Sequence, residues 1–161
     1  MDSQKLLRIA YQKAEDSRNP STRNGALLVN DEGEVLVSAS NTLTPDGVLE
    51  TEERKVKPLR LKFSVHAERN VIYQAAKLGI KTEGLTMVCG WATCGDCAQG
   101  IIQAGIKALI THKQALDKNG SWAEEVKLGF VMLKEAGVKV EIYDGEIGGV
   151  KVLRNDEYWE P

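Results

Sequence analysis

The strongest constraint on the fold is a set of metal-binding side chains that stand in two separate segments of the chain. His66 lies in one segment, and Cys94 and Cys97 lie in the other with two residues between them. Zinc accepts imidazole nitrogen and thiolate sulfur in tetrahedral geometry, and three protein ligands leave its fourth position open. Each segment leads into a helix-like stretch, so the two sulfurs and the imidazole can face one point. The pattern therefore predicts two helix starts that meet at a catalytic zinc centre.

Glu68 follows His66 by two residues at the same predicted helix start. That offset places a carboxylate near the open position of the metal without making it a ligand. A carboxylate there can take a proton from an activated water and return it to a leaving amine. His-x-Glu followed by Cys-x-x-Cys, with the Glu as proton shuttle, is the pattern of zinc-dependent deaminases of nucleobases. We therefore interpret Glu68 as the catalytic residue.

The Cys-x-x-Cys pair is also compatible with two other kinds of site. A thioredoxin-like redox pair would not require His66 and Glu68, and a closed structural zinc site needs a fourth ligand. The remaining His and Cys are His112 and Cys89, and Cys89 lies in an apolar stretch typical of a core strand. An odd number of cysteines, two of them closely spaced, favours metal use in a reducing cytoplasm over a disulfide framework.

Composition limits the possible partners. The 161 residues have a net charge of −2 and are 42% hydrophobic, which is typical of one globular domain. No apolar run has the length of a membrane span, and the mixed-charge N-terminus does not resemble a signal peptide. The overall charge argues against polynucleotide binding. We interpret the basic residues between positions 54 and 62 as a solvated loop and expect a cytoplasmic protein.

Helical and strand patterns alternate along the chain after an opening hairpin. We predict helices over residues 3–17, 65–78, 97–104 and 121–136, and strands over residues 25–30, 34–40, 85–89, 108–111 and 138–143. Ser121 and Glu124 are spaced to form a capping box at the last helix. This order predicts an α/β fold with a mixed sheet that helices cover on both faces.

The chain is expected to form one domain over residues 1–145, followed by a C-terminal tail over residues 146–161. Residues 42–61 are polar and contain Pro45, Gly47 and Pro58, so a long loop is expected there. The tail is interpreted as a packing strap rather than as a cover for the active site of its own or a neighbouring subunit.

Four segments together resemble one family. They are Ser17-Arg18-Asn19-Pro20 with Gly25-Ala26, Val65-His66-Ala67-Glu68 with Asn70, Cys97-Ala98 with Ile101-Ile102-Gln103-Ala104-Gly105-Ile106-Lys107, and Ala136-Gly137-Val138. This set is similar to the motifs of the cytidine deaminase superfamily, and within it to the deoxycytidylate deaminases of cellular and phage type. The resemblance covers about residues 5–143.

The resemblance implies a three-layer α/β/α cytidine-deaminase-like fold with a five-stranded mixed sheet. It also implies hydrolysis of dCMP to dUMP and ammonia, one catalytic Zn²⁺ and a homo-oligomer. By motif, Ala67 would offer its backbone to the base and Asn41 would bond to the deoxyribose. Arg23, in the loop before the first strand, is the candidate for the phosphate. Residues 41–65 contain no Cys or His for the second zinc that some phage members hold.

The departures from the family pattern leave the substrate open. Thr93 replaces the Pro before the first Cys, and the neighbouring Trp91 either stacks on a base or fills the core. Asn24 replaces an apolar residue and brings an amide toward the expected pocket. These changes are compatible with a modified or differently phosphorylated nucleotide. Ala39-Ser40-Asn41-Thr42 replaces a Gly-Tyr-Asn-Gly segment, so altered regulation by dCTP and dTTP is expected.

Two further functions are alternatives to a nucleotide deaminase. A deaminase acting on a base in single-stranded nucleic acid would need a positively charged path for the strand. A non-catalytic zinc-stabilised binding module would have no use for the proton shuttle Glu68 beside an open ligand position. Both are less consistent with the sequence than a nucleotide deaminase.

Overall fold

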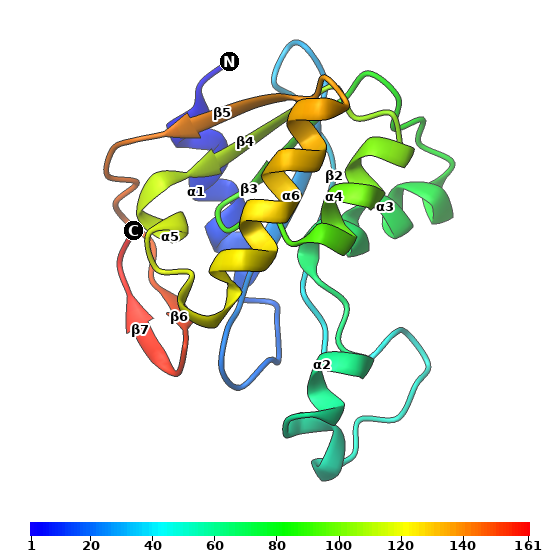
Figure 1. The fold of residues 1–161 in the computed structure, drawn as a ribbon, viewed down its shortest axis with the longest axis vertical. Coiled ribbons are helices and arrows are strands. Elements are labelled where there is room, and N and C mark those ends of the chain that lie inside the picture. The colour runs from blue at the N-terminus through cyan, green and yellow to red at the C-terminus, as the bar shows by residue number, and fades with distance from the viewer.

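A five-stranded mixed sheet forms the middle layer of the fold (Figure 1). The computed structural model describes residues 1–161, and the strand order is β2-β1-β3-β4-β5. Strand β1 is antiparallel to both β2 and β3, whereas β3, β4 and β5 run parallel. The strands are β1 (Gly25–Val29), β2 (Val35–Ser40), β3 (Thr86–Cys89), β4 (Ala108–His112) and β5 (Lys139–Tyr143).

Helices cover both faces of this sheet, as the sequence predicts. Helix α1 packs on one face, and α3, α4 and α6 pack on the other (Figure 1). The helices are α1 (Ser3–Ala14), α2 (Leu59–Phe63), α3 (Ala67–Leu78), α4 (Gly95–Gln103), α5 (Lys113–Leu116) and α6 (Ala123–Glu135), with 3-10 turns η1 (Glu52–Lys55) and η2 (Gly120–Trp122). The predicted three-layer α/β/α class is therefore confirmed.

Strand β1 shows why the layers form. All five of its residues are buried, and they alternate between the two cores: Leu27 and Val29 face α1, whereas Ala26 and Leu28 face α3. Gly25 permits the close approach of α1, because a Cβ at that position would stand 2.1 Å from the carbonyl oxygen of Ala10. The Gly-Ala pair at the strand start is thus a packing requirement.

Several boundaries differ from the expected ones. Helix α4 begins at Gly95, earlier than predicted, with Cys94 as its N-cap. The predicted capping box is absent, because Ser121 lies in the 3-10 turn η2 and Trp122 precedes α6 without a side-chain cap. The long loop contains η1 and α2, which form an arm that projects from the body (Figure 1).

The C-terminal tail forms a small antiparallel hairpin of its own, which the sequence does not predict. Its strands are β6 (Val152–Arg154) and β7 (Glu157–Trp159). Ile147, Val150 and Val152 are buried against the core beneath α1. The tail is therefore packed along the same face of the sheet as α1. None of the helices combines the length and the apolar character that crossing a lipid bilayer requires.

His112 ties the tail to α1 and the sheet. Its Nδ1 accepts a hydrogen bond from the Tyr11 hydroxyl at 2.8 Å, and its Nε2 donates to the carbonyl oxygen of Gly145 at 2.9 Å. Burial lowers the pKa of His112, which favours the neutral ring that these two contacts require. The only other His in the chain, besides His66, is therefore a core residue.

Candidate metal centre and substrate pocket

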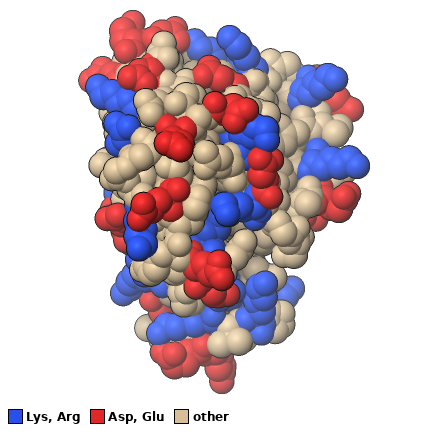
Figure 2. All heavy atoms as spheres, turned by 90° about the vertical axis from the view of Figure 1, so that its left-hand side faces the viewer, with Lys and Arg blue, Asp and Glu red and all other residues tan.

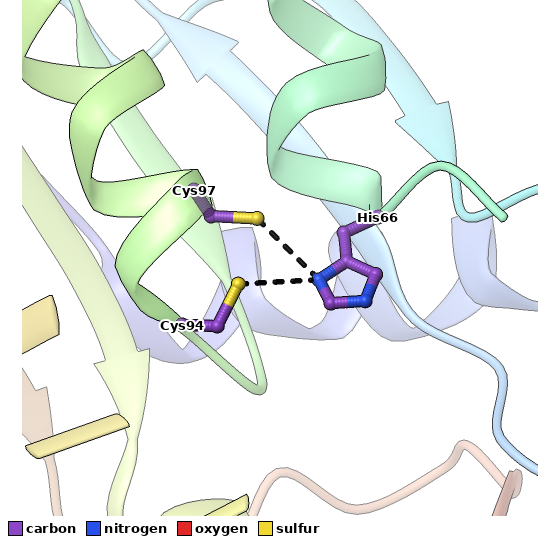
Figure 3. Close-up of side chains that lie close together, drawn as sticks. All are labelled: His66, Cys94 and Cys97. Carbon is purple, nitrogen blue, oxygen red and sulfur yellow. Dashed lines mark hydrogen bonds between the residues drawn. The ribbon is translucent and has the colours of Figure 1, made fainter. Parts of the chain in front are cut away.

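The three predicted metal ligands meet between the starts of α3 and α4 (Figure 3). His66 is the N-cap of α3, Cys94 is the N-cap of α4, and Cys97 lies in the first turn of α4. The Nδ1 atom of His66 lies 3.5 Å from the sulfur of Cys94 and 3.5 Å from that of Cys97. All three ligand atoms lie within 4.8 Å of one another.

This geometry fits a tetrahedral zinc ion. With Zn–S near 2.3 Å and Zn–N near 2.05 Å, a tetrahedral angle separates nitrogen and sulfur by about 3.6 Å. The two nitrogen–sulfur distances in the structure, 3.5 Å each, agree with this expected separation. Two thiols and one imidazole are also the donor set that zinc prefers, and they leave one coordination position open. The residues present therefore fit the metal that the sequence predicts.

The surroundings favour a thiolate at Cys94. A hydrogen bond from the Cys97 thiol and the proximity of His66 lower the pKa of Cys94 against the effect of its burial. The N-terminus of α4 adds a partial positive charge beside the same sulfur. The remaining cysteine, Cys89, is buried in β3, and burial raises the pKa of its thiol. The hydrogen bond to Cys94 and burial raise the pKa of Cys97 as well, so it is the meeting with His66, and not acidity alone, that distinguishes this pair from Cys89.

Glu68 lies in the first turn of α3, where the sequence predicts it. Its side chain is only 3% exposed, and burial raises the pKa of this carboxyl to about 7. It lines the same pocket as His66 and Cys94. The carboxyl bonds to the backbone N–H of its own residue and to no other side chain, so it is available to a ligand in the pocket.

The pocket opens in front of these residues and is formed by five parts of the chain. Its residues are Asn19, Thr22, Asn24, Asn41, Arg60, Leu61, Ser64, His66, Ala67, Glu68, Trp91, Ala92, Thr93, Cys94, Trp122 and Val126. Four of the five residues predicted to bind substrate, Asn24, Asn41, Ala67 and Trp91, are among them. Their roles toward a substrate stay predictions.

The two predicted asparagines hold the rim of the pocket together. The side-chain oxygen of Asn41 accepts from the backbone N–H of Asn24 at 2.8 Å, and its Nδ2 donates to the carbonyl oxygen of Thr22 at 2.9 Å. The Nδ2 of Asn24 donates to the carbonyl oxygen of Trp91 at 2.8 Å. Each amide retains free hydrogen-bonding capacity, because Asn offers two donors and two acceptor positions.

Two tryptophans form an aromatic wall. The ring of Trp122 lies edge-on to His66, with the ring centroids 5.4 Å apart, and it is perpendicular to Trp91 at 6.4 Å. Helix α6 carries Trp122 at its start and reaches the site because Gly129 lets it approach closely. A Cβ on Gly129 would stand 2.2 Å from the carbonyl oxygen of Thr93.

Arg23 is placed differently from the other predicted residues. It lies in the loop before β1, but it is not among the residues that form the pocket. Its Nε donates to the carbonyl oxygen of Asn19 at 3.4 Å. The cation in the pocket wall is Arg60 of α2, which the sequence interpretation assigned to a solvated loop. The only sequence signal for a role of Arg60 in the site is its position shortly before the His66 motif.

Comparison with known proteins places this site in a family. The family model for the cytidine and deoxycytidylate deaminase zinc-binding region matches residues 1–113. The chain is 30% identical to the deoxycytidylate deaminase of Mus musculus over 140 residues, which are 83% of this chain and 74% of the mouse protein. The deoxycytidylate deaminase of Enterobacteria phage T2 is 38% identical over 79 residues, or 49% of this chain. That match spans only 38% of the phage protein.

A solved structure agrees with this comparison. The dCMP deaminase of cyanophage S-TIM5, in complex with dCMP and dUMP, superposes with a TM-score of 0.65 at 26% identity. The superposition covers 85% of this chain and 93% of the cyanophage chain. The fold and the site thus define a protein of the cytidine deaminase class. The chain belongs to the cytidine and deoxycytidylate deaminase family.

Proposed function

We propose that this protein is a zinc-dependent deaminase that hydrolyses dCMP to dUMP and ammonia. The observation that carries the proposal is the meeting of His66, Cys94 and Cys97 around one point, with buried Glu68 facing the same pocket. The names of the T2 and mouse relatives and the dCMP and dUMP bound to the cyanophage enzyme support the choice of substrate. A zinc ion held by these three residues would supply an electrophile that acidifies water.

The residues of this chain divide the remaining work. Glu68 takes a proton from the attacking water, protonates N3 of the cytosine, and passes a proton to the departing amino group at C4. Water and the cytosine ring thereby give the uracil ring and ammonia. Trp91 and Trp122 close the sides of the pocket, which excludes bulk water from the carboxylate. Asn41 and the backbone of Ala67 orient the sugar and the base.

The direct test is ammonia release by the zinc-loaded protein from a panel of nucleosides, nucleotides and oligonucleotides. We expect dCMP to react with the highest kcat/KM, ahead of CMP, dCTP, deoxycytidine and 5-substituted dCMP. If only a 5-substituted nucleotide or a triphosphate reacts, deamination stands, and Asn24, Trp91 and Thr93 become the candidates for the altered specificity. If no compound of the panel releases ammonia, the proposed enzyme activity is wrong.

A single-stranded polynucleotide is less consistent with the surface. On the face shown in Figure 2, lysines and arginines are interspersed with aspartates and glutamates rather than gathered into a continuous path. The net charge of −2 agrees with this distribution. An oligonucleotide that competes with dCMP in the ammonia assay would favour the polynucleotide alternative. Assembly into a homo-oligomer stays a prediction from the resemblance, and a cytoplasmic location stays a prediction from the cysteine usage.

Within this proposal, we assign the 5′-phosphate of the nucleotide to Arg60. It is the only Lys or Arg among the residues that form the pocket, and the hydroxyls of Thr22 and Ser64 share the wall with it. Its guanidinium has one hydrogen bond in the structure, from Nη1 to the carbonyl oxygen of Lys55 at 3.3 Å, so other donors remain for an anion. Arg23, the sequence-based candidate, lies outside the wall.

Replacing Arg60 with Gln should weaken the binding of the phosphate without affecting the binding of the sugar and the base. We expect the KM for dCMP to rise about thirtyfold, because a charge-assisted contact of this kind contributes about 2 kcal/mol. The kcat/KM for deoxycytidine, which has no phosphate, should stay within about twofold of the wild type. Steady-state kinetics with both substrates measure the difference.

Lys62→Gln is the matched control, because Lys62 is an exposed cation of the same helix and does not form the pocket. This variant removes one positive charge that lies outside the pocket. Its KM for dCMP should change little at moderate salt. Arg23→Gln is measured beside it. A large rise in KM for Arg23→Gln, with none for Arg60→Gln, would return the phosphate to Arg23.

A further inference from the structure

The C-terminal hairpin is bonded to the loop that forms one wall of the pocket. The backbone N–H of Arg23 donates to the carbonyl oxygen of Leu153 at 2.8 Å, and the N–H of Asp156 donates to that of Ser21 at 2.9 Å. The N–H of Asn155 donates to the hydroxyl oxygen of Thr22 at 3.0 Å, and Thr22 itself faces the pocket. Three hydrogen bonds thus fix the position of this loop relative to the tail.

The same hairpin supports a second part of the pocket wall, Trp91, through Arg154. This side chain is 6% exposed, and its guanidinium carbon lies 3.8 Å from the centroid of the Trp91 ring. Its Nη2 donates to the carbonyl oxygen of Ala115 at 2.6 Å, whereas its buried Nε has no hydrogen-bond partner. The guanidinium is thus held by one hydrogen bond and by its stacking on the indole, which is the preferred ring for a cation.

The indole of Trp91 has few other constraints. Its Nε1 donates to the side-chain oxygen of Asn119, and its ring is perpendicular to that of Trp122. Asn119 stands in the connection before η2, to which the hairpin is also joined by Asn155 through the carbonyl oxygen of Lys118. Arg154 thus covers one face of the indole ring, and the hairpin is also bonded, through Asn155, to the segment that carries Asn119.

We propose that the C-terminal hairpin is part of the framework of the substrate pocket and that Arg154 is a positioning residue, which holds Trp91 at the angle that receives the nucleotide. The family model ends at residue 113, so this function belongs to a segment outside the family's zinc-binding region. The inference rests on the proposed function for its kinetic test. Its structural test is independent of turnover.

The test compares Arg154→Gln and Arg154→Lys with Lys151→Gln. Lys151 is an exposed cation directly before β6 that lies over Tyr158 and is not among the pocket residues, which makes it the matched control. We expect Arg154→Gln to raise the KM for dCMP about fivefold, with kcat and zinc content within about twofold of the wild type. Arg154→Lys keeps a cation but loses the planar group that stacks on the indole, so its KM for dCMP should lie between those of the wild type and Arg154→Gln.

Fluorescence of Trp91 provides the second measurement. With Trp122 and Trp159 replaced by Phe, Trp91 is the only indole, since the chain has three. In that protein Arg154→Gln should shift the emission of Trp91 to longer wavelength and increase its quenching by iodide, and Lys151→Gln should do neither. These changes are measured well below the unfolding temperature of each variant.

These outcomes distinguish a positioning role of Arg154 from a purely structural role. A rise in KM together with the Trp91 emission shift supports the positioning role. A folded Arg154→Gln protein with an unchanged KM overturns it, even if the protein is less stable, because a purely structural role lowers stability alone. If Arg154→Gln does not fold, the intermediate KM expected for Arg154→Lys decides in the same way. If the wild type does not deaminate dCMP, the proposed function fails, and an unchanged Trp91 emission in Arg154→Gln would overturn the positioning role separately.

Discussion

Glu68→Gln should lower kcat for dCMP about a thousandfold while the protein keeps its zinc and its fold. General acid–base catalysis by one positioned group contributes about 10² to 10⁴ in rate, and Glu68 moves the proton more than once in the proposed reaction. Glutamine has the same shape but no titratable proton. Because Glu68 is 3% exposed, a neutral amide at this position should not destabilise the protein. Single-turnover kinetics and metal analysis of the purified variant measure both quantities.

Asp96→Asn is the matched control for this substitution. Asp96 stands between Cys94 and Cys97, but its side chain is 74% exposed and pairs with Arg69 at 3.9 Å. The same loss of one negative charge near the metal, on the solvent side, should change kcat less than about threefold. An active Glu68→Gln enzyme, or an equal loss in both variants, would refute the assignment of the proton transfer to Glu68.

The positions of His66, Cys94, Cys97 and Glu68 at two helix starts could be predicted from sequence because short motifs encode their geometry. His66 and Cys94 are each the residue that begins a helix, and a helix start fixes the direction of the side chains in its first turn. Only the meeting of the two helices required the tertiary fold. The order of strands and helices brings the two helix starts together, because α3 and α4 pack on the same face of the sheet.

The pocket walls could not be predicted, because nothing local marks them. Trp122 reaches His66 only after α6 packs against the Thr93 loop at Gly129. Arg60 lies in a projecting arm whose composition is that of a solvated loop.

The hairpin of the tail was also missed, for two reasons. Strands β6 and β7 have three residues each, which is too short to show a period of two along the sequence. Arg154 is charged, and a charged residue is expected at the surface. Its burial becomes favourable only when Trp91 and the carbonyl oxygen of Ala115 are in place to receive it.

Cys97→Ala should abolish zinc binding and activity together, which is the second large effect. Cys97 is fully buried, so no exposed side chain can replace its sulfur, and His66 with Cys94 alone forms an incomplete tetrahedron. Zinc affinity should fall more than about a hundredfold, since even residues that only support ligands change affinity about 10- to 100-fold. Metal analysis after dialysis against a weak chelator, together with ammonia release, measures both losses.

Thermal unfolding adds a test that does not depend on turnover. A metal that binds only the folded state raises its stability by RT ln(1 + [Zn]/Kd), so a strong chelator should lower the Tm of the wild type. Cys89→Ala is the matched control, because Cys89 is an equally buried cysteine in β3 that is not in the ligand group. Its Tm should still fall on chelation, whereas the Tm of Cys97→Ala should not respond. If Cys97→Ala bound zinc as tightly as the wild type, the metal would not lie between α3 and α4, and the proposed position of Glu68 beside it would lose its basis.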